Sequence, residues 1–120
     1  MTRILLVEDS PTDIALVKEA LSELNHSIDL HVIENGTEAL RWLEGVAAHD
    51  NLRPSLIILD LRMPGLDGRE VLNHIRGSVD TAALPVLIRT GAGTAKDEAE
   101  LLDAGADDFM AKSVDSARFL

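Results

Sequence analysis

The chain contains no cysteine. This absence excludes a disulfide framework, a zinc site with thiolate ligands and a cysteine nucleophile. No apolar run approaches the roughly 18 residues of a membrane span, and the N-terminus lacks the layout of a signal peptide, so we expect a cytoplasmic protein. Basic residues are also scarce, since 11 Lys and Arg stand against 21 Asp and Glu and the formal net charge is −10. Nucleic acids and anionic membranes are therefore not expected as partners.

The length and composition are those of one globular domain. The 120 residues are 46% hydrophobic and 27% charged, which are ordinary values for a folded protein. A chain of this length can bury roughly two-thirds of the surface that it exposes when unfolded. We therefore expect a single folded unit over residues 1–120.

Short apolar runs alternate with segments of helical period five times along the chain. This alternation is typical of a parallel sheet whose strands are connected by helices. It predicts an α/β fold, a (βα)5 doubly wound parallel sheet, and we expect the strand order 2-1-3-4-5 that is common in such sheets. The expected strands are residues 4–7, 28–33, 56–59, 85–88 and 109–111. The most uniformly apolar run, 56–59, should be central, and the alternating run 28–33 should lie at an edge.

Polar residues mark where several helices begin. Ser10-Pro11 predicts the start of the first helix, because serine caps free N–H groups and proline suits the first turn. Asp67-Gly68 precedes the third helix, and Thr94 with Asp97 has the spacing to cap the fourth. Only eight residues follow Lys112, so the last helix should be short.

Chemically active side chains follow four of the expected strands. They are Glu8 and Asp9 after the first strand, Asp60 after the third, Thr90 after the fourth and Lys112 after the fifth. In a doubly wound sheet these strand ends meet where the strand order reverses. The three carboxylates would repel one another unless a cation joined them, and oxygen ligands favour Mg²⁺. The ammonium of Lys112 and the hydroxyl of Thr90 suit phosphoryl oxygens, so we predict phosphorylation of Asp60.

At these residues the sequence resembles the receiver domain of two-component response regulators, over essentially the whole chain up to the last helix. The motifs are residues 5–9, residues 57–68, the strand ending in Thr90, and residues 105–109 ahead of Lys112. The resemblance implies a flavodoxin-like fold and a Mg²⁺-dependent phosphorelay function. It also implies one role for each matching residue: Asp60 as phosphoacceptor and metal ligand, Glu8 and Asp9 as further Mg²⁺ ligands, the Arg62 backbone carbonyl as another, Lys112 as phosphate partner, Thr90 as switch hydroxyl, and Phe109 as the aromatic that reports activation.

The segments 8–13 and 67–72 look most like single-domain regulators that pair with phytochrome-type histidine kinases. The resemblance therefore implies a sensor histidine kinase as phosphoryl donor and a downstream protein as target. A short last helix would leave the fifth strand with an exposed edge, which favours pairing with another chain. We therefore expect a homodimer through residues 109–120.

Two residues depart from the family pattern. Ser113 stands where the family has proline, often with a cis bond, and cis costs about 2.5–4 kcal/mol for a residue other than proline. Arg89 stands where the strand is normally apolar, and its guanidinium either reaches a carboxylate or extends outward. The short C-terminus is either native or a truncation.

Two other functions remain open on the sequence. Ser113, Arg89 and the short tail favour an interaction module that works without phosphorylation. A Mg²⁺-dependent phosphohydrolase with Asp60 as nucleophile is the second alternative. Haloacid-dehalogenase-like phosphatases, however, have an aspartate two residues after the nucleophile, where this chain has Arg62, and a cap domain that it lacks. We therefore predict a regulatory phosphoacceptor rather than an enzyme.

The remaining polar groups favour structural roles. The histidines are scattered over separate elements without metal-ligand or triad spacing, so surface or half-buried positions are expected. They are His26, His31, His49 and His74. Asp107-Asp108 precedes the fifth strand at the end of the sheet opposite Asp60, and we interpret it as a loop pair.

Overall fold

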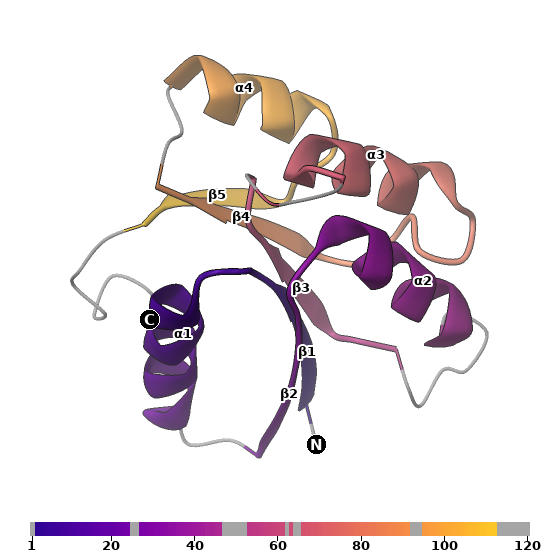
Figure 1. The fold of residues 1–120 in the computed structure, drawn as a ribbon. Coiled ribbons are helices and arrows are strands. Elements are labelled where there is room, and N and C mark those ends of the chain that lie inside the picture. The colour runs from indigo at the N-terminus through magenta and orange to yellow at the C-terminus, as the bar shows by residue number, and fades with distance from the viewer. Residues whose placement is uncertain are drawn as a thin grey trace.

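A computed structural model of the chain describes residues 2–24, 27–46, 53–61, 63, 66–91 and 95–112. The elements alternate as strand and helix along these residues (Figure 1). They are β1 (Thr2–Val7), α1 (Pro11–Ser22), β2 (Ile28–Ile33), α2 (Gly36–Val46), β3 (Leu56–Leu59), α3 (Gly68–Gly77), β4 (Val86–Thr90), α4 (Ala95–Asp103) and β5 (Asp108–Ala111). The predicted final helix, together with Arg62, Thr94 and Ser113, lies outside the described residues.

The strands form one parallel sheet in the order β2-β1-β3-β4-β5, which confirms the predicted order. The apolar run in β3 is central, and Ile57, Ile58 and Leu59 are buried. β2 lies at an edge, where His31 is exposed. In the β1–β3 register Val7 pairs with Leu59, so the residues that follow these two strands become neighbours.

Helices cover both faces of the sheet. α1 lies on one face, and α2, α3 and α4 lie together on the other (Figure 1). The buried side chains divide accordingly. One cluster packs Val17 and Leu21 of α1 against the sheet, and a larger cluster includes Leu43, Leu72 and Leu101 from the other three helices. The two clusters of apolar side chains therefore exclude water from both faces of the sheet.

The predicted helix starts of α1 and α3 are present. The Ser10 hydroxyl accepts a hydrogen bond from the Asp13 N–H at 3.3 Å, and Pro11 occupies the first turn. Asp67 and Glu70 form a capping box, with 3.0 Å from the Glu70 N–H to Asp67 Oδ1. Each cap satisfies an N–H group that the helix itself leaves unpaired. These caps fix where the loops after β1 and β3 end.

Several polar groups have the structural roles expected of them. Asp107 accepts hydrogen bonds from Arg76 at 2.9 Å and from the Val86 N–H at 2.8 Å, so it joins α3 to the start of β4. His31 stacks on Trp42 with ring centroids 4.6 Å apart, and His74 is exposed. Among the described helices, none has the length and apolar character needed to cross a membrane.

Gly68 begins α3 directly against the loop that carries Asp60, and this contact predicts a stability difference between two glycines of one helix. A Cβ at Gly68 would lie 2.5 Å from the Asp60 carbonyl oxygen and 2.7 Å from Leu61 Cα. Gly68→Ala should therefore lower the free energy of unfolding by about 1–3 kcal/mol, as overpacking does. Urea unfolding of the variant and the wild-type protein measures this change.

Gly77→Ala is the matched control, because a Cβ at Gly77 meets no atom within 4 Å. Its free energy of unfolding should stay unchanged or rise by up to about 1 kcal/mol, since alanine favours helix more than glycine does. Equal effects of the two substitutions would show that the packing of α3 against Asp60 is not tight.

Candidate functional site

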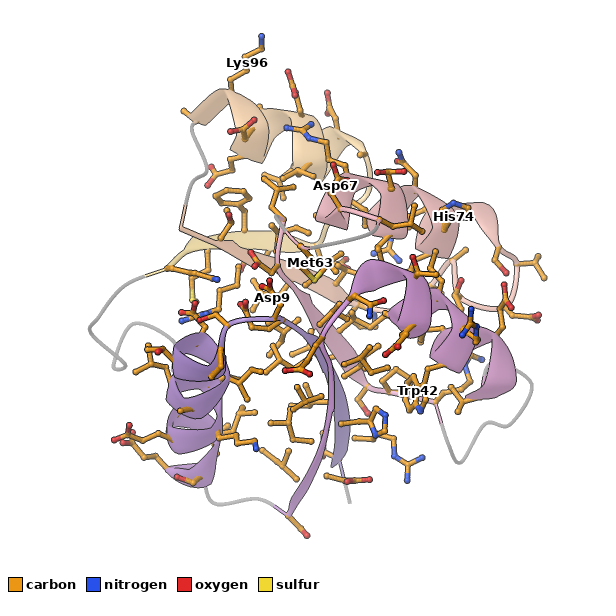
Figure 2. All side chains as sticks on the ribbon, in the orientation of Figure 1. Asp9, Trp42, Met63, Asp67, His74 and Lys96 are labelled. Carbon is orange, nitrogen blue, oxygen red and sulfur yellow. The ribbon has the colours of Figure 1, made fainter. Side chains whose placement is uncertain are left out.

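Three carboxylates gather at the carboxyl ends of β1 and β3. Glu8, Asp9 and Asp60 each offer an oxygen atom, and these three atoms lie within 4.8 Å of one another. Glu8 is 1% exposed and Asp60 is 5% exposed, whereas Asp9 is open to solvent. Figure 2 shows Asp9 where β1 ends. The cluster is thus a buried acidic pair with a third carboxylate at its mouth.

The backbone of the sheet holds the buried pair in place. The Glu8 N–H donates to the Ile33 carbonyl, and the Asp60 N–H donates to the Val7 carbonyl, both at 3.0 Å. Glu8 also accepts a hydrogen bond at Oε1 from the Ser10 N–H at 3.1 Å. The hydrogen-bond ladder of the sheet therefore continues past the strand ends and orients both carboxylates.

Lys112, which directly follows β5, brings an ammonium group to this cluster. Its Nζ lies 2.9 Å from Glu8 Oε2 and 3.4 Å from Asp60 Oδ2. Its backbone N–H donates to the Thr90 carbonyl at 2.7 Å, which ties the residue to the end of β4. The structure thus brings Lys112 to the carboxylates that the sequence places after β1 and β3.

Two further residues, Asp13 and Arg89, join the cluster, although neither was predicted as a site residue. Asp13, in the first turn of α1, places Oδ2 3.0 Å from Lys112 Nζ and Oδ1 3.4 Å from Arg89 Nη1. Arg89 is 4% exposed, and its Nη1 also lies 3.9 Å from Glu8 Oε2. Of the two predicted orientations of Arg89, the structure has the inward one. The contact between Arg89 and a carboxylate could have been predicted from the arginine in an otherwise apolar strand, since a buried guanidinium requires a carboxylate partner.

The burial and the charges of these groups shift their pKa values. Burial raises the pKa of Glu8 and the charge of Asp60 raises it further, against the hydrogen bonds from Lys112 and Ser10. Burial also opposes ionisation of Asp13, but hydrogen bonds with Lys112 and Ser10 outweigh it and lower the pKa of Asp13. Burial likewise opposes the charge of Lys112, yet Glu8, Asp13 and Asp60 together raise the pKa of its ammonium group.

The donor set fits a hard divalent cation. The ligand atoms of Glu8, Asp9 and Asp60 are all carboxylate oxygens, the type that Mg²⁺ prefers. When they and Asp13 are ionised, the four negative charges exceed the two positive charges of Lys112 and Arg89 by two. The predicted ligand role of the Arg62 carbonyl stays a prediction, because Arg62 lies outside the described residues.

Thr90 and Phe109 lie at the ends of the two strands beside the cluster. Thr90 is buried and is the last residue of β4 rather than the first beyond it, because it pairs with Ala111 of β5. Phe109 is half-buried and packs against the larger core cluster. Their predicted switch roles stay predictions.

Comparison with known proteins agrees with this geometry. The response regulator receiver domain family matches residues 4–120. The chain belongs to this family. Its receiver domain is 33% identical, over its full length, to the DNA-binding dual master transcriptional regulator RpaA of Synechocystis sp., of which it spans 46%. It is also 35% identical to the response regulator Rcp1 of the same organism, over 92% of this chain and 76% of Rcp1.

Solved structures of two regulators superpose closely on the receiver domain. The Mn²⁺-bound form of Rcp1 has a TM-score of 0.85 and 34% identity, over 96% of this chain and 84% of that one. The phosphorylated cyanobacterial phytochrome response regulator RcpA has a TM-score of 0.86 and 32% identity, over 98% of this chain and 84% of that one. The flavodoxin-like fold predicted from the sequence is thereby confirmed.

The raised pKa of Lys112 predicts a loss of stability at alkaline pH. Because the pKa of Lys112 is higher in the folded than in the unfolded protein, its ammonium group stabilises the fold fully below the ordinary lysine value of 10.5. This contribution of Lys112 is lost as the pH rises through the pKa that Lys112 has in the folded protein. The chain has no tyrosine or cysteine to titrate in this range. Lys112→Met should therefore flatten the dependence of the free energy of unfolding on pH above about pH 10.5, as measured by urea unfolding.

Lys96→Met is the matched control, because Lys96 is 86% exposed on its side chain and points away from the protein on α4 (Figure 2). This variant should keep the alkaline loss of the wild-type protein. A Lys112→Met variant with an unchanged alkaline slope would contradict the electrostatic role of Lys112.

Proposed function

We propose that this receiver domain is the phosphoacceptor of a two-component phosphorelay and that Asp60 accepts the phosphoryl group from a phosphohistidine of a sensor histidine kinase. One observation carries the proposal. Asp60 is buried at the reversal of strand order, within reach of the Glu8 and Asp9 carboxylates and 3.4 Å from the Lys112 ammonium group. This is the place where ligands bind in doubly wound sheets.

The transfer is a displacement at phosphorus. A carboxylate oxygen of Asp60 forms the new P–O bond, the P–N bond to the histidine breaks, and its electron pair stays on the imidazole nitrogen. The product is an acyl phosphate on Asp60 and a free histidine on the kinase. Lys112 Nζ is close enough to Asp60 to donate to the phosphoryl oxygens, and Thr90 supplies a hydroxyl at the end of β4. Both groups stabilise the charge that builds up on those oxygens.

Glu8, Asp9 and Asp60 would hold Mg²⁺, with the Arg62 carbonyl as a further ligand. When bound, Mg²⁺ supplies positive charge that offsets the negative charge of the carboxylates and the phosphoryl oxygens. The Mn²⁺-bound form of Rcp1 supports the metal, and the phosphorylated form of RcpA supports the modification.

The signal leaves this domain by protein contact. The phosphoryl group adds negative charge beside Thr90, and we propose that Thr90 and Phe109 change position in response and alter the surface around β4 and β5. The similarity to RcpA, a phytochrome response regulator, supports a phytochrome-type kinase as donor. The downstream target is a protein. Separately, we propose that two copies of the chain form a homodimer through residues 109–120.

The phosphoacceptor role predicts one phosphoryl adduct per chain. Incubation with acetyl phosphate and Mg²⁺ should give a single adduct by intact mass, because Asp60 is the proposed phosphoacceptor and lies within reach of the Glu8 and Asp9 carboxylates and of the Lys112 ammonium group. Chelation of the metal should slow the formation of the adduct by about tenfold or more, since charge stabilisation of that size is typical of such sites. Asp60→Asn should remove the adduct.

The control is Asp103→Asn, which changes an exposed aspartate at the end of α4 and should label like the wild-type protein. A wild-type chain that forms no adduct would instead favour an interaction module that works without phosphorylation. Catalytic turnover of a phosphomonoester that is lost in Asp60→Asn would favour the phosphohydrolase.

A further inference from the structure

Lys112 is shared between the proposed phosphoacceptor and a second aspartate. Its Nζ lies 3.0 Å from Asp13 Oδ2 and 3.4 Å from Asp60 Oδ2, so the amine is closer to Asp13. Asp13 belongs to α1, whereas Asp60 follows β3. The side chain of Asp13 is only partly exposed, so its attraction for the ammonium group is screened less than that of a surface aspartate. Asp13 thus competes with Asp60 for the amine.

Arg89, in the neighbouring strand β4, contacts the same aspartate. Its Nη1 lies 3.4 Å from Asp13 Oδ1, while Lys112 occupies the Oδ2 side. The same nitrogen lies 3.9 Å from Glu8 Oε2. Arg89 therefore neutralises the two carboxylates that draw Lys112 away from Asp60.

We propose that Asp13 is a holding site for the Lys112 amine and that Arg89 is a positioning residue that sets how strongly Asp13 holds it. This inference rests on the proposed phosphoacceptor function of Asp60. When Asp60 gains a phosphoryl group, Lys112 moves from Asp13 to the phosphoryl oxygens. Arg89 stays with Asp13, so that carboxylate is not left partly buried without a cation, a state that is costly.

The proposal predicts opposite effects for two neighbours in one ion-pair network. Asp13→Asn removes the competing carboxylate, so Lys112 becomes more available to the phosphoryl group and phosphorylation by acetyl phosphate becomes faster. Arg89→Met leaves Lys112 as the remaining cation at Asp13 among the described contacts, so the amine is held more tightly and phosphorylation becomes slower. We expect each substitution to change the phosphorylation rate by roughly threefold or more, as is typical of coupled residues in one network. In the double variant, Arg89→Met should have little further effect.

The position of the amine can also be followed without phosphorylation or metal. The chain has three lysines, Lys18, Lys96 and Lys112, so NMR of the lysine ε-methylene groups gives few signals, and Lys112→Met assigns that of Lys112. The Lys112 signal should shift in Asp13→Asn and in Arg89→Met. If Arg89 only supported the fold, Arg89→Met would leave the Lys112 signal in place.

The matched controls come from another aspartate–arginine pair. Arg69 Nη2 lies 2.8 Å from Asp97 Oδ1, between α3 and α4. Asp97→Asn and Arg69→Met should leave both the phosphorylation rate and the Lys112 signal as in the wild-type protein. If Arg89→Met does not fold, Asp13→Asn and Arg89→Lys test the proposal, since lysine keeps the charge and should restore most of the wild-type rate.

Three results would overturn the inference. An adduct that forms in Asp13→Asn at the wild-type rate, with the Lys112 signal unmoved, overturns the holding site and leaves the phosphoacceptor function intact. Equal slowing by Asp13→Asn and Arg89→Met shows that the pair only supports the fold. A wild-type protein that forms no adduct overturns the phosphoacceptor function and this inference with it.

Discussion

The site depends on the burial of two carboxylates, Glu8 and Asp60, side by side where the strand order reverses. Because Val7 pairs with Leu59, the residues that follow β1 and β3 are neighbours, and both Glu8 and Asp60 are buried there. Buried carboxylates this close to each other destabilise the fold unless cations neutralise them. The network around them follows from this requirement, since Lys112 and Arg89 both reach Glu8. The same negative charge favours a divalent cation at the site.

The rest of the fold holds this charged site at the edge of a well-packed core. Helices on both faces bury the strands up to the last apolar residue of β1 and β3, and the caps of α1 and α3 end the loops that follow these two strands. The α3 helix begins at Gly68, close against Asp60. The strands therefore position the reactive groups, and Arg89, which departs from the family pattern, adds its charge to two of the carboxylates, Glu8 and Asp13.

Arg89 shows how one departure from the family pattern changes the interpretation of the site. On the sequence, Arg89 together with Ser113 and the short tail favours an interaction module that works without phosphorylation. In the structure Arg89 contacts Asp13 and Glu8, and Lys112 remains 3.4 Å from Asp60. The guanidinium thus adds positive charge where the site has an excess of carboxylates, which is compatible with phosphorylation.

Local patterns were sufficient to predict the strands, the caps at Ser10 and Asp67, and the acidic residues after β1 and β3, whereas the strand order was expected from the doubly wound fold class. These features depend on alternation, capping chemistry and the rule that parallel strands bring their carboxyl ends together. The partnership of Asp13 with Arg89 and Lys112 required the folded chain, because these residues are separated by 76 and 99 positions and come from three different elements. No periodicity links such distant residues. Their contact arises when α1 packs beside the ends of β4 and β5 and the buried charges must find partners.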